Sequence, residues 1–252
     1  MSSDFEVNSC FEDALEKFKA ENPNCKIEVF SGDSQQIKDG LGLKDYPKPI
    51  DRSYPQYLIK VGREEHMIPL LKQGVVYMNP LSYFKDLEDK GDGRADSGEG
   101  AHSVAQTGGI IIGGLSINQK TTITITSPTE NHGYIFCMVG VYKGEKIEDV
   151  LTEKMFEMGS VAIIIYNPEQ FIKRCDAVLK ANNKSLEWGR VRYYDKSEGS
   201  FLLNPWLKTK DYEYQSEFRL FVPMKETKAK VLQIGSIEDI AQAFSISTKK
   251  KT

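Results

Sequence analysis

The sequence contains no hydrophobic run that is long enough to cross a membrane. Its longest apolar runs are as short as VAIIIY at 161–166, whereas a membrane-spanning helix needs about 20 consecutive apolar residues. The opening stretch MSSDFEVNSC has neither the basic region nor the apolar region of a secretory signal. We therefore expect a protein that is not inserted in a membrane and that stays in the cytoplasm.

Cysteine and histidine, which commonly bind metals, are few, and they lack the spacings of known metal sites. The four cysteines, Cys10, Cys25, Cys137 and Cys175, are far apart and form no C-x-x-C pair, which argues against a zinc site and favours a reducing compartment. The three histidines show neither H-x-x-x-H nor H-E-x-x-H spacing. The acid-rich run at 86–99 lacks the residue order of a calcium-binding EF-hand loop. We therefore predict no bound metal, and a metal-dependent nuclease that uses this acidic run stays an alternative.

Two further catalytic signatures and a strong charge bias are also missing. The sequence has no G-x-S-x-G nucleophile motif. The glycines of TGGIIIGGLSI at 107–117 surround an apolar strand instead of forming a phosphate-binding loop. The chain has 33 basic and 36 acidic residues, a net charge of -3. The overall charge therefore does not indicate nucleic-acid binding, although a local basic groove stays open.

What the sequence does contain is many short alternating segments with helical segments scattered among them. We expect strands at 56–61, 75–78, 108–117, 121–126, 134–142, 160–166, 189–194, 216–222 and 229–234. We expect helices at 63–73, 79–89, 145–159, 167–183 and 236–244. Asn79 and Asn167 each precede a proline and are predicted to cap a helix. The irregular order predicts an α+β fold with a mixed or mostly antiparallel sheet and several short flanking helices.

The domain organisation is suggested by a change in composition near residue 50. The segment GLGLKDYPKPIDRSYPQ at 40–56 carries three prolines and two glycines, as a linker would. Before it, the sequence predicts a helix and a strand. We therefore expect an N-terminal helix–strand arm or subdomain at 1–50 and a main α+β domain at 51–252.

The segment QSEFRLFV places two charged residues in a strand that is otherwise suited to burial. If 216–222 is a strand, Glu217 and Arg219 face one side while apolar residues at alternate positions face the other. A buried ion pair is costly unless its charges are compensated or used. Two interpretations stay open: an ion pair on the exposed face of the sheet, or a carboxylate that faces a cleft. In the second, Gln215 lies on the same face and forms a Q-x-E pair with Glu217.

Two other segments offer candidate binding residues. YMNPLSYF contains Tyr77, Asn79 and Tyr83, which either pack in the core or line a cleft with polar groups outward. The glycine-rich segment GDGRADSGEG at 91–100 carries Arg94 as its single cation. A lone guanidinium on such a loop either neutralises its own acidic neighbours or binds a phosphate.

The order of these segments resembles that of a known group of bacterial proteins. YLIKVGREEHMIPLLKQGVVYMNPLSYF, GRADSGEG and KTKDYEYQSEFRLF follow one another as in an uncharacterised bacterial family that is similar to DarT-type toxins and other ADP-ribosyltransferase-like proteins. The resemblance covers roughly 55–225. It implies an ADP-ribosyltransferase-like fold, NAD as a substrate, and a role in bacterial or phage toxicity or defence. The acceptor implied is a macromolecule, either a nucleic acid or a protein.

The resemblance also implies roles for individual residues. Arg94 would pair with a phosphate of the dinucleotide. Glu217 would hydrogen-bond a ribose hydroxyl and stabilise positive charge on the sugar as the nicotinamide bond breaks. Gln215 would orient the acceptor, and Tyr83 or Tyr77 would stack on nicotinamide.

The chain departs from the family pattern at two points. Its first core strand carries Lys60 where many such transferases have a histidine or an arginine, and no S-T-S triplet is visible on a middle strand. Lys60 and Asn79 complete the candidate NAD-binding residues. The alternative that follows from these departures is a module of the same fold that binds a nucleotide or a partner without catalysis.

Overall fold

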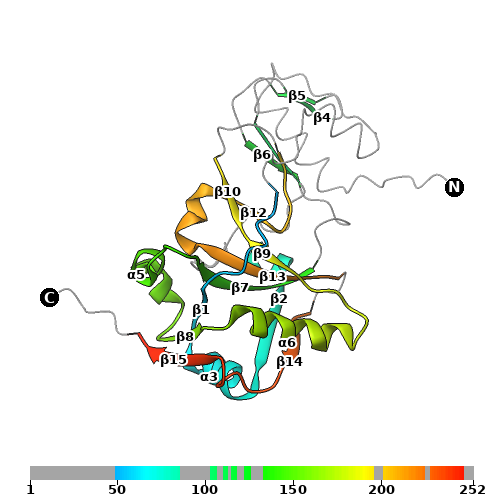
Figure 1. Ribbon diagram of the computed structural model, residues 1–252. Coiled ribbons are helices and arrows are strands. Elements are labelled where there is room, and N and C mark those ends of the chain that lie inside the picture. The colour runs from blue at the N-terminus through cyan, green and yellow to red at the C-terminus, as the bar shows by residue number, and fades with distance from the viewer. Residues whose placement is uncertain are drawn as a thin grey trace.

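The structure is a computed structural model that describes residues 49–85, 103–106, 110–112, 115–117, 122–125, 133–195, 201–224 and 228–246. These residues form a mixed α+β fold with a mostly antiparallel sheet and short helices, as predicted (Figure 1). The expected N-terminal arm lies outside the described residues except for 49–50, and so does Arg94. No helix within these ranges is long and apolar enough to span a membrane.

The main sheet has eight strands, and every pairing within it is antiparallel. Its order is β14-β2-β7-β1-β8-β15, and β13 lies between β7 and β9. The strands are β1 (Tyr57–Gly62), β2 (Val75–Pro80), β7 (Gly133–Val141), β8 (Val161–Ile165), β9 (Glu187–Arg190), β13 (Glu217–Pro223), β14 (Lys230–Gln233) and β15 (Ala241–Ser245). The long strand β7 is central because it pairs with β13, β1 and β2.

Short helices and three smaller sheets accompany the main sheet. The helices are α3 (Glu64–Gln73), α4 (Leu81–Lys85), α5 (Ile147–Val150) and α6 (Pro168–Lys180), with 3-10 helices η2 (Glu153–Met158) and η4 (Lys210–Gln215). One small sheet is the parallel pair β10 (Arg192–Tyr194) and β12 (Leu207–Thr209). The others are β11 (Phe201–Leu202), β3 (Ser103–Gln106) and β6 (Thr122–Ile125), and the hairpin β4 (Ile110–Ile112) and β5 (Leu115–Ile117).

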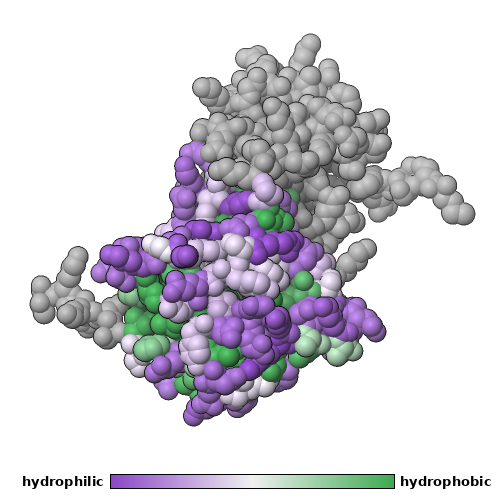
Figure 2. Space-filling view, viewed as in Figure 1, coloured by the Kyte–Doolittle hydropathy of each residue, from purple (hydrophilic) through white to green (hydrophobic). Residues whose placement is uncertain are grey.

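Alternate side chains of β13 point to opposite faces of the main sheet and belong to different core clusters. Phe218 and Leu220 are fully buried in the large cluster that includes Phe171 of α6. Phe221 belongs to a separate cluster around Trp206. The predicted alternation of this strand is therefore confirmed. Figure 2 shows that hydrophilic residues dominate the surface over α6, as expected for a helix that packs its apolar side on a sheet.

Helix α6 begins, and helix α3 ends, at the residues that the sequence predicted. The Asn167 side chain accepts a hydrogen bond of 3.1 Å from the backbone N–H of Gln170, so it caps α6. Gly74 follows α3 in the left-handed conformation with φ of 66°, which glycine adopts without steric cost.

Three helix predictions are wrong at least in part. The predicted helix 79–89 starts only at Leu81, because Asn79 and Pro80 extend β2 and pair with β7. The predicted helix 145–159 is one short α-helical turn followed by η2. Val150 and Met155 pack in one cluster, although a continuous helix would turn side chains five positions apart about 140° away from each other.

The predicted helix 236–244 is also wrong. This segment turns and then forms β15, which pairs with β8 along its length. Ile237 and Ile240 are buried in the main core before the strand begins. The free edge of β8 gains a full set of backbone hydrogen bonds in this arrangement, and that tertiary pairing outweighs the helical spacing of the apolar residues.

Candidate functional site

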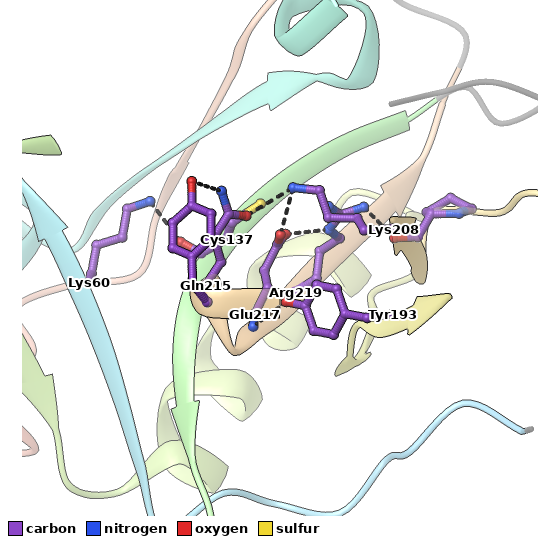
Figure 3. A network of polar contacts seen from close by, with 9 residues as sticks. Lys60, Cys137, Tyr193, Lys208, Gln215, Glu217 and Arg219 are labelled. Atoms are coloured by element: carbon purple, nitrogen blue, oxygen red, sulfur yellow. Dashed lines mark hydrogen bonds and ion pairs between the residues drawn. The ribbon is translucent and has the colours of Figure 1, made fainter. Parts of the chain in front are cut away.

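The charged residues of β13 form a buried network with a lysine from β12 (Figure 3). Arg219 Nε donates to Glu217 Oε1 at 2.7 Å, and Lys208 Nζ donates to Glu217 Oε2 at 3.0 Å. The side chains of Glu217, Lys208 and Arg219 are 4%, 5% and 0% exposed. The interpretation of Glu217 and Arg219 as an exposed ion pair is therefore wrong, because other elements cover this face of the sheet.

The small parallel sheet brings these residues together. Tyr193 of β10 and Lys208 of β12 are paired neighbours in it. The Tyr193 hydroxyl accepts a hydrogen bond of 2.9 Å from the backbone N–H of Glu217, so it fixes the first residue of β13. Arg219 also donates to the carbonyl oxygen of Pro205, in the segment that leads into β12. The network thus ties the start of β13 to β10 and β12.

Glu217 stays ionised in this environment. Burial alone raises the pKa of the carboxyl group because it removes water from the charged form. The positive charges of Arg219 and Lys208, and the hydrogen bonds from Arg219 and the Cys137 thiol, act in the opposite direction and prevail. The pKa of Glu217 therefore lies well below the usual range for glutamate, and the side chain is a buried anion between two cations.

Gln215 joins the same network through Lys208, although it lies in η4 and not in the strand. Its Oε1 accepts a hydrogen bond of 3.0 Å from Lys208 Nζ, and its Nε2 lies 3.4 Å from the Tyr214 hydroxyl. Lys208 thus donates to both Gln215 and Glu217. Sequence reasoning missed Lys208, because β12 is too short to show a strand pattern and the resemblance does not distinguish Lys208 from the nearby Lys210.

Lys60 lies close to this network, on the other side of β7. Its Nζ donates to the carbonyl oxygen of Cys137 at 2.7 Å and lies 4.8 Å from the centre of the Phe136 ring. Cys137 is paired with Arg219 across β7 and β13. Burial raises the pKa of the Cys137 thiol, which therefore stays protonated at neutral pH. The pairing of β1 with β7 ends at Ile59 and Val139, and the pairing of β2 with β7 ends at Asn79 and Ile135. Cys137 lies between these two paired segments, where its carbonyl oxygen accepts the hydrogen bond from Lys60.

The other candidate residues are not brought to Glu217. Tyr77 is 53% exposed on β2, and Asn79 is half-buried and pairs with Ile135 of β7. Tyr83 of α4 packs edge-on against Phe84 at 5.4 Å. No contact among the described residues joins these three to Glu217, and Arg94 lies outside those residues.

No family model, curated protein or solved structure matches the chain. Within the ranges that the structure describes, no group of three or more potential metal ligands is found; the acidic run at 86–99 falls outside them.

The network combines a fixed anion with an excess of positive charge. Two cations surround one carboxylate. A carboxylate has about four lone-pair positions, so Glu217 can accept a further hydrogen bond beyond those from Arg219, Lys208 and Cys137. The remaining acceptor position of Glu217 suits a hydroxyl donor.

Proposed function

We propose that the chain is an NAD-consuming ADP-ribosyltransferase-like protein in which Glu217 stabilises the reacting sugar. The observation that supports this function is the buried, ionised Glu217 carboxylate, with Gln215 bound to the same Lys208. A permanent anion in a water-poor site stabilises positive charge that develops nearby, because little solvent reorganisation is needed during the reaction. Positive charge develops on the ribose carbon when a nicotinamide glycosidic bond breaks.

The proposed reaction uses the residues of the network in separate roles. The bond between nicotinamide and ribose breaks, and its electron pair leaves with nicotinamide. Glu217 accepts a hydrogen bond from a ribose hydroxyl and stabilises the cationic sugar, while Lys208 and Arg219 hold the carboxylate in place. Gln215 orients a nucleophile of a macromolecular acceptor, which forms the new bond to the ribose carbon and loses its proton. In a bacterial or phage setting such a modification would serve toxicity or defence.

The test is the release of nicotinamide from NAD by the purified chain in the presence of a cell lysate, together with the mass of any adduct. We expect Glu217→Gln to lower turnover by about 10²–10³-fold, since it removes the charge while keeping the shape. Glu213→Gln is the matched control because Glu213 is exposed on η4, only four residues away; its turnover should equal that of the wild type. Absence of turnover in the wild type, or equal turnover in the Glu217→Gln variant, contradicts the proposal.

Gln215 provides a second arm of the same experiment. If Gln215 orients the acceptor, Gln215→Ala should reduce the amount of adduct much more than it reduces nicotinamide release. A parallel loss of both products would assign Gln215 to the structure of the site and not to the acceptor.

A second candidate function is nucleotide binding without chemistry. It is favoured by the fact that both Glu217 oxygens already have cationic partners and that the cations outnumber the carboxylate. Thermal unfolding with NAD and with ADP-ribose separates the two functions, because a ligand that binds only the folded state raises the melting temperature whether or not it reacts. Stabilisation without nicotinamide release supports this candidate over the transferase.

A further inference from the structure

A second candidate site lies on the opposite face of the main sheet from Glu217. It is a hollow of about 440 Å³ between α6 and the segment at 184–188. Trp188, which lines it, is paired with Leu220 and packs against the large core cluster. Residues paired directly across strands share a face, so Trp188 points to the side of Leu220, whereas Glu217 and Arg219 point to the other side.

One wall of the hollow is a rigid stack of aromatic rings. Tyr54 stacks on Trp188 with the ring centres 4.6 Å apart and an angle of 22° between the planes. Trp188 in turn lies over the buried Phe218 at 6.0 Å and 28°. Tyr54 is 44% exposed, so the stack runs from the core to the surface and presents an aromatic ring to solvent.

The segment that carries Tyr54 is held firmly on β9. The backbone N–H of Arg190 donates to the carbonyl oxygen of Asp51 at 2.9 Å, and Arg52 Nη1 donates to the carbonyl oxygen of Trp188 at 3.0 Å. Ser53 donates to the Asp51 carboxylate from both its backbone and its hydroxyl. The aromatic wall is therefore in place before any ligand arrives, which lowers the entropy lost on binding.

Three lysines also line the hollow. Lys173, Lys180 and Lys184 lie there with one acid, Asp176, and Lys173 forms an ion pair of 2.8 Å with Glu169. Lys180 is oriented by an ion pair of 2.7 Å with Asp176, whereas Lys184 is exposed and makes no ion pair with any residue that the structure describes. Lysines and an exposed aromatic ring in one hollow suit a ligand that is both planar and anionic.

We propose that this hollow binds a nucleotide, with the base stacked on the Tyr54 and Trp188 pair and the phosphate held by Lys180 and Lys184. Every base has an aromatic face that stacks on tyrosine or tryptophan, and ammonium groups bind phosphate as compact charges. The volume lies within the range typical of small-molecule sites. This site is separate from the NAD site proposed around Glu217, and its occupant is either a free mononucleotide or one nucleotide of a single strand.

The test is calorimetric titration of the full chain with AMP and, separately, with a short single-stranded oligoadenylate. Tyr54→Ala should weaken binding by about tenfold or more, because it removes the exposed stacking surface. Lys184→Gln should weaken binding severalfold and reduce its dependence on salt. Glu213→Gln should leave binding unchanged, because Glu213 is exposed on η4 and does not line the hollow. Tyr54 and Lys184 are exposed, and unchanged melting temperatures of their variants confirm that they are folded.

Each result of this titration decides the proposal. Tighter binding of AMP identifies a free nucleotide as the occupant, and tighter binding of the oligoadenylate identifies a single strand. The proposal is overturned if neither probe binds. It is also overturned if Tyr54→Ala binds like the wild type.

Discussion

Replacing Glu217 with alanine is expected to lower the free energy of unfolding by about 3–5 kcal/mol. The substitution removes the anion and leaves Lys208 and Arg219 buried beside each other without a compensating charge. Buried cations without a partner are strongly unfavourable, because the protein interior replaces little of the hydration that they lose. Gln215 and the Pro205 carbonyl oxygen still accept hydrogen bonds, but neither supplies a negative charge. Urea unfolding at pH 7 measures the change.

Two variants show whether the loss comes from the charge. Glu213→Ala alters an exposed glutamate of η4 and should leave the unfolding free energy unchanged. Glu217→Gln keeps the shape and an acceptor oxygen while it removes the charge, so its loss should be smaller than that of Glu217→Ala but clear. If Glu217→Ala is as stable as Glu213→Ala, the buried ion network described above does not exist in solution.

The stability contributed by Glu217 is expected to disappear on acidification. Its pKa is lower in the folded chain than in the unfolded chain, so the unfolded chain binds its proton first as the pH falls. The contribution is therefore complete above the ordinary glutamate pKa of about 4.3 and is lost as the pH falls below that value towards the folded pKa. We expect the difference in unfolding free energy between the wild type and Glu217→Gln to be constant from neutral pH down to about pH 5 and to shrink below about pH 4.

Comparing the wild type with Glu217→Gln isolates the contribution of the Glu217 carboxylate. All other carboxyl groups are shared, so their protonation affects both chains in the same way and largely cancels in the difference. Urea titrations at several pH values supply the data. A difference that grows as the pH falls from 7 to 5 would mean that burial, and not the two cations, controls the pKa, because a raised folded pKa lets the folded chain bind the proton first.

The sequence predicted local structure well where a segment carries its own pattern. The alternation in 216–222 correctly placed Glu217 and Arg219 on the face opposite Phe218, and the spacing Asn-Pro-Glu correctly placed the start of α6. These features depend on neighbouring residues only, namely on side-chain direction in a strand and on a capping side chain.

The environment of those residues could not be predicted in the same way. Whether Glu217 is exposed or buried depends on β10 and β12. The predicted strand 189–194 includes β10, but the chain leaves the main sheet after β9 and β10 pairs with β12 instead, while β12 is a three-residue strand that is too short to show a periodic pattern. Lys208 reaches the carboxylate only because β12 lies over the start of β13. The error at 236–244 has the same origin, because its apolar spacing suits a helix while the open edge of β8 selects a strand.

Glu217 is an ionised carboxylate held inside the protein by Lys208 and Arg219. A carbon-13 NMR titration of the chain labelled at glutamate side-chain carboxyls tests it directly, with the Glu217 signal assigned by its absence in Glu217→Gln. We expect this signal to keep the chemical shift of a carboxylate well below the ordinary glutamate pKa of about 4.3 for as long as the chain stays folded. A signal that titrates at or above that pH would contradict it.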